Sequence, residues 1–191
     1  MAELADAPDL GSGGLHLTGS SPVAGTTSVK IAVSSADSIK EIRLTVDFLA
    51  GQPLNYPKYQ EWVGRAEAEL FKGHKRAILA FLDGHLVADL VWQPHKQVSQ
   101  LLEIKNLRVH ANVRQREFGR FLLKQVETMP GYAGIICDVQ AEETGIRDFM
   151  VRCGYNIAAT VPLYDSEKAD LVLVKPLVPN YNFTGTLAEP I

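Results

Sequence analysis

The chain has 191 residues, a formal net charge of −3, and 46% hydrophobic and 21% charged residues. This size and composition are ordinary for one folded soluble domain with a substantial core. The net acidity argues against a general nucleic-acid binder, and no apolar run approaches the ~20 residues that a membrane span needs. No secretory signal is visible at the N-terminus, and two cysteines, Cys137 and Cys153, fit a reducing compartment. We therefore expect a cytoplasmic protein.

The first part of the chain predicts an arm, a strand and two helices. Residues 1–27 are rich in Gly, Ser, Thr and Ala, which cannot offset the entropy of ordering and indicate a flexible arm. Val29–Val33 alternates as a strand does, and Ser38 with Glu41 forms a capping-box pattern that starts a helix. Apolar stripes at helical spacing support both helices: Ile39, Ile42, Val46 and Leu49 in the first, and Tyr59, Trp62, Val63, Ala66 and Leu70 in the second, which Gly73 ends.

A hairpin follows, with Asp83-Gly84 as the turn between strands Ala77–Leu82 and Leu86–Trp92. The later elements are the strand Leu101–His110, the helix Phe118–Met129, the strand Ile135–Val139, a short helix over Ile146–Cys153, and the strands Tyr155–Leu163 and Leu171–Val174. This order predicts one α/β (α+β) domain over residues 28–178, with a mixed sheet and helices on both faces. Residues 179–191 are expected to form a C-terminal tail.

The loop between the strand Leu101–His110 and the helix that follows carries the strongest functional signal. A helix N-terminus leaves backbone N–H groups unpaired and carries partial positive charge, so it suits a pyrophosphate. Gly119 allows close approach of the backbone, and Arg114, Arg116 and Arg120 add positive charge to an otherwise acidic chain. On the residues alone, arginines before a helix are most often simply solvated.

Arg114-x-x-Glu117-x-Gly119 resembles the acetyl-CoA signature of the GNAT superfamily of N-acetyltransferases, Arg/Gln-x-x-Gly-x-Gly/Ala. The segment Asp148–Tyr155 resembles a later family segment, usually Phe-Tyr-x-x-x-Gly-Phe, and the order of elements agrees over residues 29–177. The resemblance implies a single-domain GNAT-like fold. Its sheet would be mostly antiparallel and splayed at the cofactor site, between Leu101–His110 and Ile135–Val139.

The resemblance also implies acetyl-CoA as co-substrate. The backbone around Leu107 and Val109 would pair with the pantetheine arm like an added strand. The residues around the pyrophosphate would be Val113, Arg114, Glu117, Phe118, Gly119 and Arg120.

The sequence departs from the family pattern at several positions. Glu117 occupies a slot usually filled by Gly, and we expect its side chain to point outward or to pair with a neighbouring arginine. Met150 stands where many members place a tyrosine that protonates the leaving thiolate. Glu143 and Ile146 replace the Asn and Ala that are common near the cofactor.

Acetylation of an amine requires an uncharged nucleophile, so a general base helps at neutral pH. Glu103 resembles the base of the histone-acetylating branch, where a Glu-Ile pair has the same register. Strand alternation would put Glu103 on one face with Lys105, Leu107 and Val109. Alternatively, Glu103 is a structural carboxylate paired with Lys105 or an arginine.

Tyr164 and then Tyr155 are the candidates for the general acid; an ordinary half-exposed tyrosine and a core tyrosine are the respective alternatives. Tyr56, Tyr59 and Trp62 lie where the superfamily usually walls the acceptor site, although such a stripe also fits core packing. The five histidines show no metal-ligand spacing.

The predicted function is transfer of an acetyl group from acetyl-CoA to a primary amine of a small molecule or protein. Two alternatives stay open: a toxin-like acetyltransferase of aminoacyl-tRNA, and a non-catalytic module that senses acyl-CoA. Net acidity counts against the first, whereas Glu117 and Met150 favour the second. The tail could cover the acceptor cleft or mediate a homodimer.

Overall fold

The computed structural model describes residues 30–52, 54 and 56–183. The predicted arm over 1–27 and the end of the tail, 184–191, lie outside the described residues. The elements are β1 (Ile31–Ser35), α1 (Ile39–Ala50), α2 (Tyr59–Phe71), β2 (Arg76–Leu82), β3 (His85–Pro94), β4 (Leu101–Val109), the 3-10 turn η1 (Ala111–Val113), α3 (Phe118–Glu127), β5 (Gly134–Gln140), α4 (Thr144–Arg152), β6 (Asn156–Val161) and β7 (Asp170–Pro176). Their order is the predicted one.

Local signals set most element boundaries. Ser38 and Glu41 form the predicted capping box at the start of α1, and Gly73, with φ of 70°, follows α2 in the left-handed region that favours glycine. Two predictions were displaced. The first strand lies two residues later than Val29–Val33, and Ile39 is 63% exposed instead of facing the core. The first error falls on the edge strand and the second at the first residue of α1, and both places are largely exposed, so burial constrains them little.

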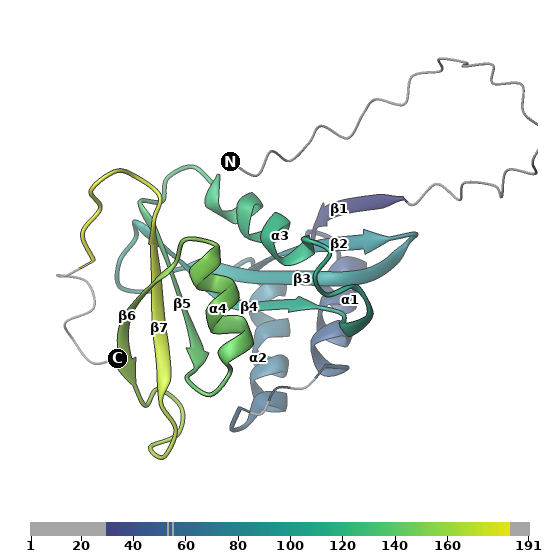
Figure 1. Ribbon diagram of the computed structural model, residues 1–191. Helices are drawn as coiled ribbons and strands as arrows, with labels where there is room; N and C mark the ends of the chain where they lie inside the picture. Colours follow the sequence, from purple (N-terminus) through teal and green to yellow (C-terminus); the bar gives the residue numbers. More distant parts are fainter. Residues whose placement is uncertain (1–29, 53, 55, 184–191) are drawn as a thin grey trace, which may run out of the picture.

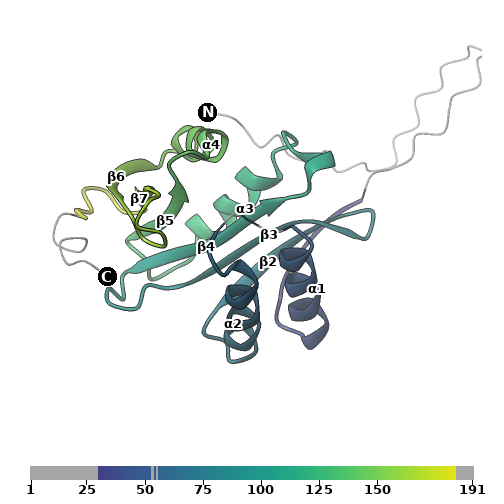
Figure 2. The ribbon, with the colours of Figure 1, turned by 90° about the horizontal axis from the view of Figure 1, so that it is seen from below.

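The seven strands form one sheet in the order β1-β2-β3-β4-β5-β7-β6. β4 and β5 are parallel, and the other neighbours are antiparallel. α3 and α4 cover one face of the sheet, and α1 and α2 cover the other (Figures 1 and 2). The sheet is thus mixed and mostly antiparallel, as predicted.

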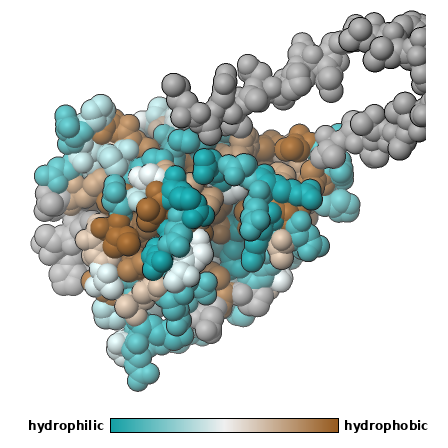
Figure 3. Space-filling model, viewed as in Figure 1, coloured by the Kyte–Doolittle hydropathy of each residue, from teal (hydrophilic) through white to brown (hydrophobic). Residues whose placement is uncertain are grey.

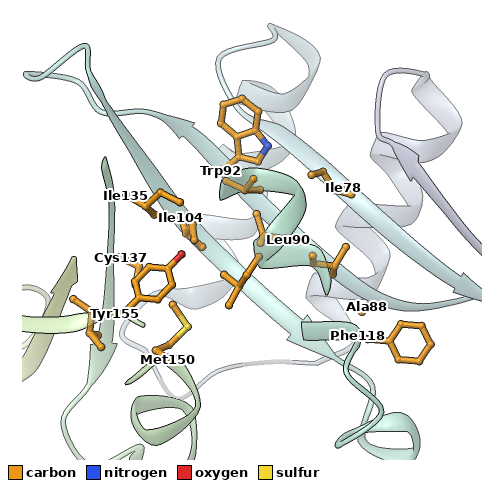
Figure 4. Packing of buried hydrophobic residues seen from close by; sticks show 14 of the residues in the cluster. Ile78, Ala88, Leu90, Trp92, Ile104, Phe118, Ile135, Cys137, Met150 and Tyr155 are labelled. Atoms are coloured by element: carbon orange, nitrogen blue, oxygen red, sulfur yellow. The ribbon is translucent and has the colours of Figure 1, made fainter. Parts of the chain in front are cut away.

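Two apolar clusters fill the layers on either side of the sheet. The larger cluster lies between the sheet and α3 and α4, and includes Leu90, Leu122 and Tyr155; Figure 4 shows part of it. The smaller cluster joins α1 and α2 to β2 and β3. On the outer surface of the α3–α4 side, hydrophilic and apolar groups are mixed (Figure 3).

β4 and β5 part midway along their length. Leu101–Ile104 pairs with Gly134–Cys137, and no pairing is recorded between the described residues beyond Ile104 and Cys137. Against β3, Val91 pairs with Asn106 and Trp92 with Ile104, so Lys105 is an extra, bulged residue. A bulge bends its strand and interrupts alternation, and this one coincides with the point where β4 leaves β5.

The bulge corrects the predicted face of β4. Leu107 and Val109 pack toward α3 with the larger cluster. Glu103 instead contacts Gln93, and Arg108 contacts Tyr59 of α2, on the opposite face. Glu103 therefore does not share a face with Leu107 and Val109, because the extra residue shifts the alternation by one.

The first residues of the predicted tail pack on the domain. Phe183 lies against the start of β5, where a Cβ atom added to Gly134 would be 2.7 Å from the Phe183 ring. Tyr181 and Phe183 meet edge to face, with ring centroids 4.9 Å apart.

Candidate active site

The loop between β4 and α3 forms one end of the candidate site. Val113 and Phe118 are buried beneath it and anchor the loop to the core. Arg114 donates from Nε to the carbonyl oxygen of Val109 at 3.3 Å, while Arg116 is exposed. The first N–H groups of α3 follow directly and have no intrahelical acceptors, so the loop presents backbone donors and positive charge together.

Glu117, immediately before α3, points outward and pairs with a neighbouring arginine, as predicted. Its side chain is 71% exposed, and Oε2 lies 3.1 Å from Nε of Arg120. Its φ of 61° is in the left-handed region, where glycine is favoured because it lacks a Cβ. This backbone conformation gives a physical reason for the family's glycine at this position.

Replacing Glu117 by glycine should strengthen acetyl-CoA binding, because it removes a carboxylate beside the proposed pyrophosphate position. The free energy of unfolding should change by less than about 1 kcal/mol, since relief of left-handed strain offsets the flexibility that glycine adds to the unfolded chain. Gln115→Gly is the matched control, because Gln115 also has a positive φ, 65°, but no charge. Calorimetric titration measures the acetyl-CoA affinity of both variants. Equal affinities in the two would contradict the prediction.

Gly119 in the first turn of α3 allows close helix packing. A Cβ atom there would lie 3.1 Å from Cζ of Phe149 and 3.6 Å from Cγ2 of Val109. Any side chain must therefore displace the Phe149 ring or project into the space between α3 and α4. His110, beside the loop, accepts the N–H of Asn112 through Nδ1 and caps η1.

A polar cluster lies on the other face of the sheet, where β4 and β5 part. Glu103 Oε1 accepts from Lys105 Nζ at 2.9 Å, and Glu103 Oε2 accepts from Gln93 Nε2 at 2.6 Å. Burial raises the pKa of Glu103, but the charge and hydrogen bond of Lys105, with the hydrogen bond from Gln93, outweigh it and leave the pKa lowered. The pairing with Lys105 that the sequence left open is thus present.

Asp138, which the sequence analysis missed, lies in the same cluster. It is the first β5 residue beyond the last pair with β4, and the hydroxyl of Tyr164 lies close enough to affect its pKa. Burial raises the pKa of Asp138, opposed by Lys105 and Tyr164. The sequence could have indicated Asp138 as a candidate, because it is the one charged residue in the otherwise apolar run Ile135–Val139.

Two tyrosines from distant segments lie near Asp138. Tyr164, from the β6–β7 connection, meets Tyr56, from the α1–α2 connection, edge to face with ring centroids 5.3 Å apart. Burial and the Asp138 carboxylate raise the pKa of both hydroxyls. Tyr59 is instead buried under α1, donating to the carbonyl oxygen of Leu49.

Tyr155 lies apart from this cluster. It is 1% exposed, within the core that faces α3 and α4, and Figure 4 shows its ring between Cys137 and Met150. Its hydroxyl has no hydrogen-bond partner among the described residues. The sheet separates Tyr155 from Glu103, so the two catalytic candidates cannot act on one atom from these positions. Met150 is equally a core residue.

A buried network connects β3 and β4 to the α1–α2 connection. Both carboxylate oxygens of Asp89 accept from Nδ2 of Asn106, at 3.1 and 2.9 Å. Arg108 donates to Asn106 and Tyr59 and to the backbone carbonyl oxygen of Gln52. Burial raises the pKa of Asp89 to about 7, although Arg108 and Asn106 oppose the shift.

Asp89→Asn should remove a pH dependence of stability. Between about pH 4 and about pH 7 the folded protein keeps a proton on Asp89 that the unfolded chain has released. The free energy of unfolding therefore falls as pH rises through this range, by up to ~1.4 kcal/mol per unit. The variant is neutral throughout and should lack that decline. Denaturant titrations across this range test it, with Asp47→Asn on exposed α1 surface as the control; parallel curves for Asp89→Asn and the natural chain would contradict the prediction.

An open groove of about 600 Å³ lies near the C-terminal ends of α2, β3 and α3 and shares Gln93 with the polar cluster. Trp92, Gln93 and Tyr132 line part of it. No cluster of three metal-ligating side chains occurs in residues 30–52, 54 and 56–183. Among those same residues, no helix is long and apolar enough to cross a membrane.

No protein-family model matches the sequence, and no curated protein matches it significantly. Solved structures do match. An aminoglycoside 6'-N-acetyltransferase complexed with coenzyme A is 17% identical with a TM-score of 0.62, over 80% of this chain and 99% of that one. The ribosomal-protein-S18-alanine N-acetyltransferase from Escherichia coli is 15% identical with a TM-score of 0.62, over 81% and 100%.

An acetyltransferase of the GNAT family from Streptococcus pneumoniae is 12% identical with a TM-score of 0.58, over 77% of this chain and 99% of that one. At these identities the likeness is one of fold, and it spans nearly the whole of each matched protein. Together with the parting of β4 and β5 and the loop before α3, it shows that this chain has the GNAT acetyltransferase fold.

Proposed function

We propose that the protein transfers an acetyl group from acetyl-CoA to a primary amine. The observation that carries the proposal is the parting of β4 and β5 between two chemically different ends. The loop before α3 offers backbone N–H groups and arginines at one end, and carboxylates and tyrosines gather at the point of divergence. An anion-binding end and a proton-transferring end are what this reaction requires.

The residues fit the co-substrate. Beyond Ile104, the β4 edge that faces β5 is free of strand pairing among the described residues, so Leu107 and Val109 can pair through their backbone with a pantetheine arm. The pyrophosphate would lie against the backbone of Val113–Arg120. The structural neighbour with coenzyme A bound supports this assignment, and the thioester supplies the acetyl group.

The proposed chemistry rests on the chain's own polar groups. A carboxylate of the cluster takes a proton from the acceptor ammonium, which frees the nitrogen lone pair. Glu103 and Asp138 are the carboxylates in position, and Tyr164 is the hydroxyl that can exchange a proton beside them. Tyr56 and Tyr164 would wall the acceptor.

Release of free thiol from acetyl-CoA, measured across a panel of amines, tests the proposal. Turnover with an amine and loss of turnover in a variant of the loop before α3 would support it. Binding of acetyl-CoA without thiol release on any amine would favour a sensing module instead. Growth arrest on expression, relieved by the same loop variant, would favour the aminoacyl-tRNA alternative.

A further inference from the structure

The two carboxylates of the cluster are held in opposite ways. Glu103 has both oxygens occupied by donors, from Lys105 at 2.9 Å and from Gln93 at 2.6 Å. Gln93 is 6% exposed, so its amide has little access to water that could replace these bonds. Protonation would remove one acceptor oxygen of Glu103 and leave a buried donor unpaired, which disfavours the protonated form.

A second buried cation fixes the orientation of Gln93. Lys75, 6% exposed, donates from Nζ to Gln93 Oε1, which leaves Gln93 Nε2 to donate to Glu103. Lys75 is held in turn by Glu69 Oε2 at 2.5 Å. The chain of alternating donors and acceptors therefore runs from α2 through β3 to β4 and ends on Glu103, which it keeps ionised.

Asp138 has the opposite environment. Its neighbour is the hydroxyl of Tyr164, and a hydroxyl can either donate or accept, so it tolerates both protonation states of the carboxyl. The charged groups around it are Lys105 and Glu103 from β4 and Asp170 from β7. Lys105 is already paired with Glu103, so little positive charge is left to hold Asp138 ionised.

We propose that Asp138 is the proton acceptor of the reaction, and that Lys75 and Gln93 are positioning residues that hold Glu103 as a fixed anion. This rests on the proposed function. Two neighbouring carboxyls whose environments push their pKa values apart are suited to different roles: burial raises the pKa of Asp138, whereas the pKa of Glu103 is lowered. The carboxyl with the raised pKa is the stronger base at neutral pH.

The proton balance of the step is complete. The acceptor ammonium gives one proton to the Asp138 carboxylate, and the freed nitrogen forms a bond to the acetyl carbonyl carbon. The carbon–sulfur bond then breaks, and its electron pair leaves on sulfur. A second proton from nitrogen passes to sulfur, with the Tyr164 hydroxyl in position to relay it, and Asp138 returns its proton to solvent. Fixed anionic Glu103 holds Lys105 and balances its charge.

Kinetics across pH form the first test, with acetyl-CoA and an amine that turns over. Asp138→Asn should lower kcat/KM about 10²-fold near pH 7, lose the acid limb of the pH profile, and recover rate at high pH as the amine deprotonates unaided. Glu103→Gln should lose rate but keep the acid limb. Loss of the acid limb in Glu103→Gln, with its retention in Asp138→Asn, would overturn the proposal. An unchanged melting shift with acetyl-CoA shows that each variant folds and binds.

Carboxyl titration by 13C NMR on the free protein forms the second test, and it does not depend on turnover. Glu103 should stay ionised to lower pH than Asp138, and Lys75→Met should raise the titration midpoint of Glu103 while Asp138 moves less. Exposed Lys72→Met on the same segment is the matched control. Equal midpoints for the two carboxyls, or a Glu103 midpoint that ignores Lys75→Met, would overturn the assignment. Absence of turnover with every amine would instead count against the proposed function.

Discussion

Replacing Gly119 by glutamate should abolish the stabilisation of the protein by acetyl-CoA. A ligand present at a hundredfold excess over its Kd stabilises the folded state by about 2.7 kcal/mol, and the variant should lose essentially all of this. The new Cβ atom would lie 3.1 Å from the Phe149 ring, and the longer side chain adds a carboxylate in the first turn of α3, beside the proposed pyrophosphate position. A carboxylate there would repel a pyrophosphate. Thermal unfolding with and without acetyl-CoA measures the effect.

Overpacking at Gly119 should also cost about 1–3 kcal/mol without ligand, so controls must separate packing from charge. Gly119→Ala adds the Cβ atom alone and should retain most of the ligand-induced shift. Gly64→Glu adds the same side chain on α2, where nothing lies within 4 Å of a new Cβ atom, and should retain all of it. Arg116→Glu changes an exposed loop side chain and should weaken binding at no cost to folding. If acetyl-CoA raised the melting temperature of Gly119→Glu and Arg116→Glu as much as that of the natural chain, the loop would be ruled out as the pyrophosphate site.

Tyr164→Phe should lower kcat by about 10²-fold while acetyl-CoA affinity stays unchanged. The hydroxyl neighbours Asp138, so its removal takes away the group proposed to relay a proton to sulfur. Stability should change little, because Tyr164 is 48% exposed. Steady-state kinetics at saturating acetyl-CoA measure kcat, and calorimetry measures the affinity.

Tyr155→Phe is the matched control, since it removes the same hydroxyl from the opposite face of the sheet. The Tyr155 hydroxyl is buried with no partner among the described residues, so its loss should leave the protein equally stable or up to ~1 kcal/mol more stable. Its kcat should equal that of the natural chain. A normal kcat in Tyr164→Phe beside an impaired Tyr155→Phe would reverse the two roles.

The sequence alone determined the order of elements and the position of the loop before α3, because both depend on local signals. The Ser38 capping box, the Asp83-Gly84 turn and the amphipathic α3 each follow from residues within one turn or hairpin. The same holds for Glu117, whose pairing with Arg120 spans three residues of one helix. Local patterns predict such features because every interacting group lies nearby in the chain.

Tertiary structure alone decided which polar groups meet. The bulge at Lys105 coincides with the point where β4 separates from β5, and no local pattern marks it. That one residue moved Leu107 and Val109 to the face opposite Glu103. Asp138 and Tyr164 lie 26 positions apart in the numbering, and Gln93 meets Glu103 only across the sheet. Burial raises the pKa of both Asp138 and Glu103, and the charge of Lys105 with the hydrogen bonds from Lys105 and Gln93 leaves only that of Glu103 lowered. Desolvation depends on everything packed around a group, so it exists only once the chain has folded.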